Sequence, residues 1–159
     1  MRIVIQRVTE AAVCIVGNDA HKDNGHEDRR AIGAGFMILL GVCEEDTQED
    51  ADWLVKKVVG LRVFDDENGV MNRSIMEVGG EVLVVSQFTL FASYKKGNRP
   101  SWFRAARHEI SVPLYEYFCR RLSDELGKPV RTGEFGAMMQ VSLVNDGPVT
   151  ICMDTKNKE

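Results

Sequence analysis

The sequence predicts one α+β domain in which strands predominate and two main helices pack against a sheet. Three observations carry this prediction. Apolar and polar residues alternate at the start of the chain, as they do in a strand with one buried face. Two later stretches instead repeat apolar residues at helical spacing. The elements follow one another as strands, helix, strands, helix and strands, which favours an α+β domain over alternating βαβ units.

The first strands are expected on both sides of a long polar segment. Ile3, Ile5 and Arg7 share one face of the opening strand, and a second strand is expected over residues 12–16. Residues 17–30 are rich in Asn, Asp and Gly, so they predict an extended and exposed hairpin loop. Strand character returns over residues 32–42, which are mostly apolar.

The first helix is expected to begin after Asp46 or Thr47, since either residue can cap it. Leu54, Val58 and Leu61 recur at i, i+4 and i+7, so they form an apolar stripe that should pack on the sheet.

A turn and a buried strand are expected between the helices. Residues 65–69 (DDENG) have the composition of a turn. Residues 81–90 begin as an apolar strand and become polar at Ser86 and Gln87. A polarity change of this kind often places side chains at the end of a strand, where ligands bind.

The second helix is expected to begin at a Ser111 cap and to end at Gly127. Pro113 falls in its first turn, where a missing N–H is tolerated. Four apolar residues spaced by four form its buried stripe: Leu114, Phe118, Leu122 and Leu126.

The C-terminal part of the chain predicts three more strands, over residues 130–132, 138–144 and 149–153. The sequence NDGP at 145–148 reads as a turn between the last two strands. Residues 154–159 are expected to form a flexible charged tail. Residues 1–159 therefore read as a single domain.

The composition indicates a soluble cytoplasmic protein. The N-terminus has no secretory signal, and no window is apolar over the length of a membrane span. The four cysteines are widely spaced without a C-x-x-C pair, so they are interpreted as reduced core residues. The formal net charge of −4 argues against a generic nucleic-acid binder, although a local basic patch could still grip one end of an RNA.

Histidine positions give little support to a metal site, and no metal or cofactor is expected. His21 and His26 share the polar loop with several acidic residues, but their spacing does not match known zinc motifs. His108 has no recognisable nucleophile elbow near it, so a surface histidine is the better interpretation.

One segment, residues 94–107 (YKKGNRPSWFRAAR), combines five basic residues with three aromatic ones in an otherwise acidic protein. Basic side chains can contact phosphates and rings can stack on unpaired bases. An exposed loop whose rings pack into the core remains an equally good interpretation.

Two polar motifs have both a structural and a functional interpretation. Ser86, Gln87, Phe88 and Thr89 could lie at a ligand site, or their polar groups could be satisfied within the sheet. The NDGP sequence could likewise be a turn without any function. Spacing alone favours the structural interpretation in both cases.

Taken together, four segments resemble the D-aminoacyl-tRNA deacylase family, also described as the D-tyrosyl-tRNA(Tyr) deacylase family. They are QRV at 6–8, SQFTL at 86–90, RPS at 99–101 and MQVSLVNDGPVT at 139–150. The resemblance runs along almost the whole chain, and it departs from the usual pattern at residues 17–30 and beyond Met153. It implies hydrolysis of the ester between a D-amino acid and tRNA, as chiral proofreading in translation.

The same resemblance implies a compact, β-rich and barrel-like domain that works as a homodimer with active sites at the subunit interface. Gly147 and Pro148 would form a cis peptide that enters the partner's site and excludes L side chains through its backbone carbonyls. Glycyl-tRNA, including that mischarged on tRNA-Ala, is then a second expected substrate. Arg7 would brace this loop, while Phe88 and Met139 would help to bind the terminal adenosine.

For the chemistry, the resemblance places Ser86, Gln87, Phe88 and Thr89 at the ester. Thr89 is the available hydroxyl, yet the sequence places no general base next to it, so water activated by the 2′-hydroxyl of the tRNA is favoured. Two alternatives stay open: a related hydrolase that edits L-aminoacyl-tRNA, and a non-catalytic tRNA-binding module that uses the basic segment. A metal hydrolase built on His21 and His26 is the least favoured.

Overall fold

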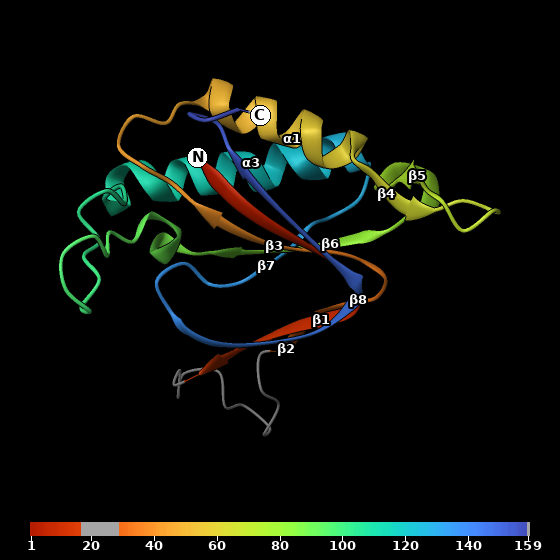
Figure 1. Cartoon of the computed structure of the whole chain (residues 1–159), viewed down its shortest axis with the longest axis horizontal. Coiled ribbons are helices and arrows are strands. Elements are labelled where there is room, and N and C mark those ends of the chain that lie inside the picture. The colour runs from red at the N-terminus through yellow and green to blue at the C-terminus, as the bar shows by residue number, and fades with distance from the viewer. Residues whose placement is uncertain (17–28, 159) are drawn as a thin grey trace.

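Two long strands, one at each end of the chain, organise the fold. In the computed structural model, which describes residues 1–16 and 29–158, β1 spans Arg2–Val16 and β8 spans Met138–Asp154. The two strands pair antiparallel along almost their whole lengths, so both ends of the chain meet beside the helices (Figure 1). There the Thr155 N–H donates to the Met1 carbonyl at 2.9 Å, and the Met1 ammonium group contacts the buried carboxylate of Asp46.

The main sheet is strongly curved because β1 has different neighbours along its length. Its first half pairs with β3 and its second half with β2, while β8 follows its other edge. Beyond β3, the parallel strands β6 and β7 extend the sheet. The result is the barrel-like arrangement expected. The four shorter strands span Arg29–Ile32 (β2), Gly35–Gly41 (β3), Glu81–Ser86 (β6) and Arg131–Thr132 (β7).

The two faces of the sheet bury different cores. Along β3, Phe36, Ile38 and Leu40 contribute to a large core beneath the helices, whereas Met37 belongs to a smaller core enclosed by the curved strands. This period of two is what a strand buried on both faces requires. The central strands therefore read as almost continuous apolar runs, and their polar ends stand out.

Two long helices cover one face of the sheet (Figure 1). Helix α1 spans Gln48–Gly60 and has Thr47 as its N-cap, so the predicted start is confirmed. Helix α3 spans His108–Leu126 and ends at Gly127 in the left-handed region, as predicted. A short helix, α2 at Ile75–Val78, and a small hairpin of β4 (Arg62–Asp65) and β5 (Met71–Ser74) were not predicted.

The predicted Ser111 cap is wrong. Helix α3 begins earlier because the backbone is already held there: the Ala106 N–H donates to the Val42 carbonyl at 2.9 Å, and the Arg107 N–H donates to the Glu44 carboxylate at 3.1 Å. Ser111 lies inside the first turn, where its hydroxyl donates to the Arg107 carbonyl at 2.9 Å.

Four strand boundaries also differ from the predictions. Strand β1 is continuous across residues 9–10, because β8 provides pairing partners as far as Val16. The predicted strand at 32–42 is divided, since β2 and β3 pair with different parts of β1. The predicted strand at 81–90 ends at Ser86, where its neighbour β3 also ends. Strand β8 continues through the predicted NDGP turn.

The two expected flexible segments have different outcomes. The predicted loop at 17–30 is shorter at its C-terminal end, because Arg29 already pairs with Cys14, and residues 17–28 lie outside the described part of the chain. The predicted flexible tail is wrong for its first residues. Thr155 is buried, and the Lys156 ammonium group donates to the Asp50 carboxylate at 2.9 Å.

The cysteines are free, but only Cys119 is buried, and Cys152 is exposed. The interpretation of all four as core residues is therefore wrong in part. Among the helices within residues 1–16 and 29–158, none is both long enough and apolar enough to cross a membrane.

Candidate active site

The SQFT motif lies where β6 leaves the sheet. Ser86 is the last residue of β6, and the Gln87 N–H donates to the Leu40 carbonyl at 2.8 Å. The chain then turns into a short 3₁₀ helix, η2 at Phe88–Phe91. Within this turn the Gln87 amide donates to the Thr89 hydroxyl, so these two polar side chains orient one another.

A pocket of about 650 Å³ opens beside this motif. Of the residues expected at the site, it is lined by Ser86, Gln87, Phe88 and Met139. Met139 comes from β8, so the pocket unites segments from the middle and the end of the chain. Thr89 is not among the described residues that line the pocket, and its hydroxyl faces Gln87 instead.

Most of the remaining pocket wall consists of residues that the sequence did not assign to a site. The Phe88 ring meets the Trp102 ring edge to face, with centroids 5.3 Å apart. Behind them lie Tyr115 and Phe135, whose ring centroids are 5.7 Å apart. The ring of His108, the first residue of α3, packs edge to face on Phe135 at 5.3 Å. Three of these rings come from the segment between η2 and the first turns of α3, so only the fold could bring them to Met139.

Tyr115 lines the pocket, and its phenol is held in the neutral form. Tyr115 donates to the Val84 carbonyl at 2.9 Å. Burial, together with the neighbouring Cys119, raises the pKa of Tyr115 far above its ordinary value, so the phenol stays protonated at neutral pH. An apolar pocket with a few fixed polar groups is typical of sites for small organic ligands.

Among the residues that the structure describes, no catalytic triad is assembled in the pocket. His108 lines the wall and is exposed, as predicted, but it forms no hydrogen bond with Ser86 or Thr89 among the described residues. Nor do residues 1–16 and 29–158 contain a group of three or more His, Cys, Asp or Glu side chains that could hold a metal ion. His21 and His26 lie outside the described residues.

The second motif, NDGP, forms a bulge in β8 opposite Arg7. Gln6 pairs with Thr150 and Val8 with Asn145, so four residues of β8 oppose the single residue Arg7. The Asn145 side chain ties the bulge together by accepting from the Val149 N–H at 2.9 Å. The Gly147-Pro148 peptide bond within it is cis.

Arg7 donates a hydrogen bond to this bulge from β1. Its guanidinium group donates to the Asp146 carbonyl at 3.1 Å and to the Val63 carbonyl at 2.6 Å, and it faces the carboxylates of Asp65 and Asp146. The Arg7 side chain is only 7% exposed. Gly147 has a positive φ of 126°, and a Cβ atom there would lie 2.8 Å from Val149 and 3.2 Å from Arg7. Arg7 therefore contacts the segment that contains the Gly147-Pro148 peptide.

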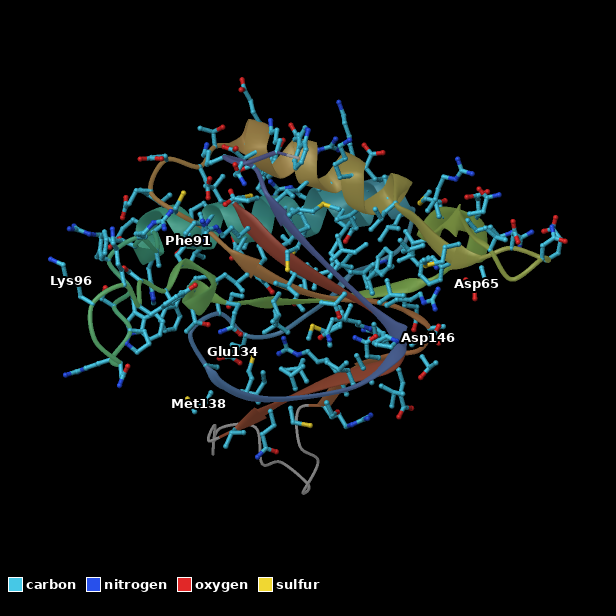
Figure 2. All side chains as sticks on the ribbon, viewed as in Figure 1. Asp65, Phe91, Lys96, Glu134, Met138 and Asp146 are labelled. Atoms are coloured by element: carbon cyan, nitrogen blue, oxygen red, sulfur yellow. The ribbon has the colours of Figure 1, made fainter. Side chains whose placement is uncertain are left out.

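The two motifs do not meet within one chain. Figure 2 shows Asp146, beside the Gly147-Pro148 bond, at one end of the molecule, whereas Glu134 and Met138, beside the pocket, lie at the other. The structure thus brings together Ser86, Gln87, Phe88 and Met139 in the pocket. It separately brings Arg7 to Gly147 and Pro148 in the bulge.

Comparison with known proteins identifies relatives over the whole length of the chain. The sequence profile of the family D-Tyr-tRNA(Tyr) deacylase matches residues 4–154. Proteins called D-aminoacyl-tRNA deacylase from Phocaeicola vulgatus and Bacteroides thetaiotaomicron are 66% and 63% identical to this chain, in alignments that cover 100% of each chain.

Two solved structures share the fold. The c-Myc DNA Unwinding Element Binding Protein is 40% identical, with a TM-score of 0.82 over 97% of this chain and 98% of that chain. A probable eukaryotic D-amino acid tRNA deacylase is 17% identical, with a TM-score of 0.77 over 96% of this chain and 97% of that chain, so it supports the fold alone.

Proposed function

The chain belongs to the D-Tyr-tRNA(Tyr) deacylase family, and on that premise we propose how its two motifs act on a D-aminoacyl-tRNA ester. The family implies aminoacyl-tRNA as the substrate and hydrolysis of the ester bond as the reaction. A cytoplasmic location belongs to the same proposal, since aminoacyl-tRNAs are used there.

The pocket beside Ser86 receives the terminal adenosine of the tRNA. The observation that carries this proposal is that Ser86, Gln87, Phe88 and Met139 line one pocket. Its volume of about 650 Å³ falls in the range usual for small-molecule sites. The exposed Phe88 ring and the Met139 thioether offer surfaces on which an adenine ring can stack.

A homodimer completes the site. In Figure 2, Asp146, the residue before Gly147, lies at the opposite end of the molecule from Met138, which lines the pocket. The bulge of one protomer therefore enters the pocket of its partner. Mixing two damaged proteins tests this directly. Phe88→Ala damages the pocket, and Gly147→Ala damages the bulge, because the new Cβ would lie 2.8 Å from Val149.

If the site is shared, a mixture of the two variants regains activity, because a mixed dimer holds one intact site. Random exchange of protomers at equal concentrations would restore about one quarter of the wild-type rate. Activity no higher than the mean of the two variants, in a mixture shown to exchange protomers, would contradict a shared site.

The Gly147-Pro148 bulge selects the chirality of the substrate. Its backbone carbonyls grip the α-ammonium group and fill the space that an L side chain needs, whereas a D side chain projects away. Glycine has no side chain to exclude, so glycyl-tRNA, including that mischarged on tRNA-Ala, is also a substrate. Rapid hydrolysis of L-Tyr-tRNA by the wild-type protein would contradict this selection and would favour the L-editing relative.

The water that attacks the ester is activated by the substrate, through the 2′-hydroxyl of the terminal ribose. Two observations support this: Thr89 is engaged by Gln87, and no charged base is hydrogen-bonded to Ser86 or Thr89 among the described residues. The motif then positions the ester and stabilises the oxyanion with N–H donors.

Thr89→Ala and His108→Gln are therefore each expected to reduce the single-turnover rate on D-Tyr-tRNA by less than about 100-fold, since loss of a true nucleophile or base costs several orders of magnitude. A substrate that ends in 2′-deoxyadenosine should be hydrolysed far more slowly by every protein. A loss of more than about 10⁴-fold in either variant, with the fold intact, would assign the chemistry to that side chain.

A further inference from the structure

The basic loop, residues 94–107, joins η2 to α3 and is held as a defined projection. Two backbone hydrogen bonds between Ser93 and Ser101, of 2.8 and 2.9 Å, close its base. Gly97 at its tip has a φ of 76°, which permits the tight reversal. The loop ends at Arg107, whose backbone N–H donates a hydrogen bond to the Glu44 carboxylate and so fixes the start of α3.

The loop concentrates positive charge in an acidic chain. It contains five cations and no Asp or Glu, while the chain has a formal net charge of −4, so the other residues together carry −9. No ion pair within residues 1–16 and 29–158 involves the loop cations, and those at the tip are exposed. The cations are Lys95, Lys96, Arg99, Arg104 and Arg107. Such a local patch attracts phosphates despite the negative net charge.

The aromatic residues of the loop are exposed rather than packed in the core. Tyr94 is 77% exposed and Phe103 is 76% exposed, which is unusual for rings of this size. Rings presented beside unpaired cations form the combination that binds unpaired nucleotides, because each base has a face that can stack. The alternative interpretation, in which the rings pack into the core, does not apply to these two residues.

The loop is continuous with the pocket. Trp102, Ala105, Ala106 and Arg107 line the pocket wall, and Trp102 packs on Phe88 of the SQFT motif. In Figure 2, Lys96 extends outward at the same end of the molecule as Glu134 and Met138. A polymer whose last residue occupies the pocket can therefore run directly along the loop.

We propose that the basic loop is the docking surface for the unpaired 3′ strand of tRNA. Lys95, Lys96, Arg99 and Arg104 contact the phosphates that precede the terminal adenosine, and Tyr94 and Phe103 stack on the bases between them. The inference rests on one part of the proposed function, the binding of the terminal adenosine in the pocket, and not on hydrolysis of the ester.

The first test measures binding, so it does not depend on catalysis. The variant Lys95→Gln/Lys96→Gln/Arg99→Gln and a matched control, Lys56→Gln/Arg120→Gln/Arg131→Gln, lose the same charge from exposed positions. Affinity for uncharged tRNA is measured by fluorescence anisotropy over a range of salt concentrations. The loop variant should bind at least tenfold more weakly than wild type. The slope of log affinity against log salt should become shallower by about 2, because each of the three lost phosphate contacts contributes about 0.7. Equal effects in loop and control variants would overturn the proposal.

The second test separates base stacking from charge. Tyr94→Ala and Phe103→Ala should each weaken binding of a short single-stranded RNA ending in CCA by at least about fivefold, with an unchanged salt slope. Unchanged affinity in both variants would remove the stacking part of the proposal. Preference of the loop for an acidic peptide over the RNA would overturn it entirely.

The third test distinguishes failure of the loop from failure of the proposed function. The value of kcat/KM is compared for D-Tyr-tRNA and for the fragment D-Tyr-adenosine, which cannot reach the loop tip. Relative to wild type, the loop variant should show a loss of kcat/KM at least fivefold larger for D-Tyr-tRNA than for D-Tyr-adenosine. If wild type hydrolyses both and the losses are equal, the loop proposal fails alone. If wild type hydrolyses neither but the loop variant has lost tRNA affinity, the proposed function fails and the loop proposal stands.

Discussion

Replacing Arg7 by lysine tests whether a buried guanidinium group holds the Gly147-Pro148 bulge in place. Arg7 reaches the carbonyls of Val63 and Asp146, and one ammonium group in its place cannot reach both. A hydrogen bond from a charged donor contributes about 1.5–3 kcal/mol, and that is the expected loss for one broken bond. The ion pairs add little, because the Asp65 and Asp146 carboxylates are 53% and 47% exposed.

Arg7→Lys should therefore lower the free energy of unfolding, measured in urea, by about 1.5–3 kcal/mol. A domain of ordinary stability, about 5–15 kcal/mol, stays folded after this loss, so its activity can be measured. The single-turnover rate on D-Tyr-tRNA should fall, or the preference for D-Tyr over L-Tyr should narrow, because the bulge is no longer fixed.

Arg121→Lys is the matched control. Arg121 pairs with Asp52 at the surface of α3, distant in sequence from both motifs, so its change should cost less than about 1 kcal/mol and leave the rates unaltered. If Arg7→Lys loses stability as expected but keeps the wild-type rates on both substrates, Arg7 does not brace the bulge. If the stability of Arg7→Lys equals that of Arg121→Lys, the hydrogen bonds from Arg7 to Val63 and Asp146 do not contribute measurably to stability.

Two further predictions concern stability. Burial of Asp50 favours its neutral form, but hydrogen bonds from Lys156, Thr155 and Thr47 outweigh this effect and lower the pKa to about 2. The charged carboxylate therefore stabilises the fold by about 2 kcal/mol above about pH 4, and this stabilisation is lost as the pH falls toward 2. Urea unfolding of wild type and Asp50→Asn at several pH values should show that only the wild type loses this stability. Parallel plots of unfolding free energy against pH would contradict the prediction. Gly35→Ala should lower the free energy of unfolding by more than about 3 kcal/mol, because φ is +156° and a Cβ would lie 1.9 Å from the Glu81 carbonyl oxygen. Gly60→Ala is the control and should be nearly neutral, because the space around Gly60 is open. Equal urea midpoints for the two variants would refute this reasoning.

The sequence predicted the features that follow from local periodicity. The stripes of α1 and α3 are buried as expected at Leu54, Val58, Phe118 and Leu122, because helical spacing reports the buried face directly. The alternation in β1 likewise placed Arg7 on the same buried face as Ile3 and Ile5. A charged residue on a buried face was itself a signal of a special role.

The features that were missed depend on pairing between distant segments. The partners of Arg7, Val63 and Asp146, lie 56 and 139 residues away, so no local pattern could identify them. The NDGP sequence has the composition of a turn, but the length of β1 available for pairing makes it a bulge within β8. The pocket wall shows the same limit, since Trp102 and Met139 line one pocket although they are distant in sequence.

Deacylation by the wild-type protein is the most direct single measurement. D-Tyr-tRNA, L-Tyr-tRNA and Gly-tRNA should be compared under single-turnover conditions, with D-Tyr-tRNA that ends in 2′-deoxyadenosine as a fourth substrate. We expect rapid hydrolysis of the D-Tyr and glycyl esters, little of the L-Tyr ester and a large loss on the deoxy substrate. Hydrolysis of L-Tyr-tRNA at a rate similar to that of D-Tyr-tRNA would contradict chiral selection by the bulge, and binding of every substrate without hydrolysis would contradict the assignment of the pocket as an active site.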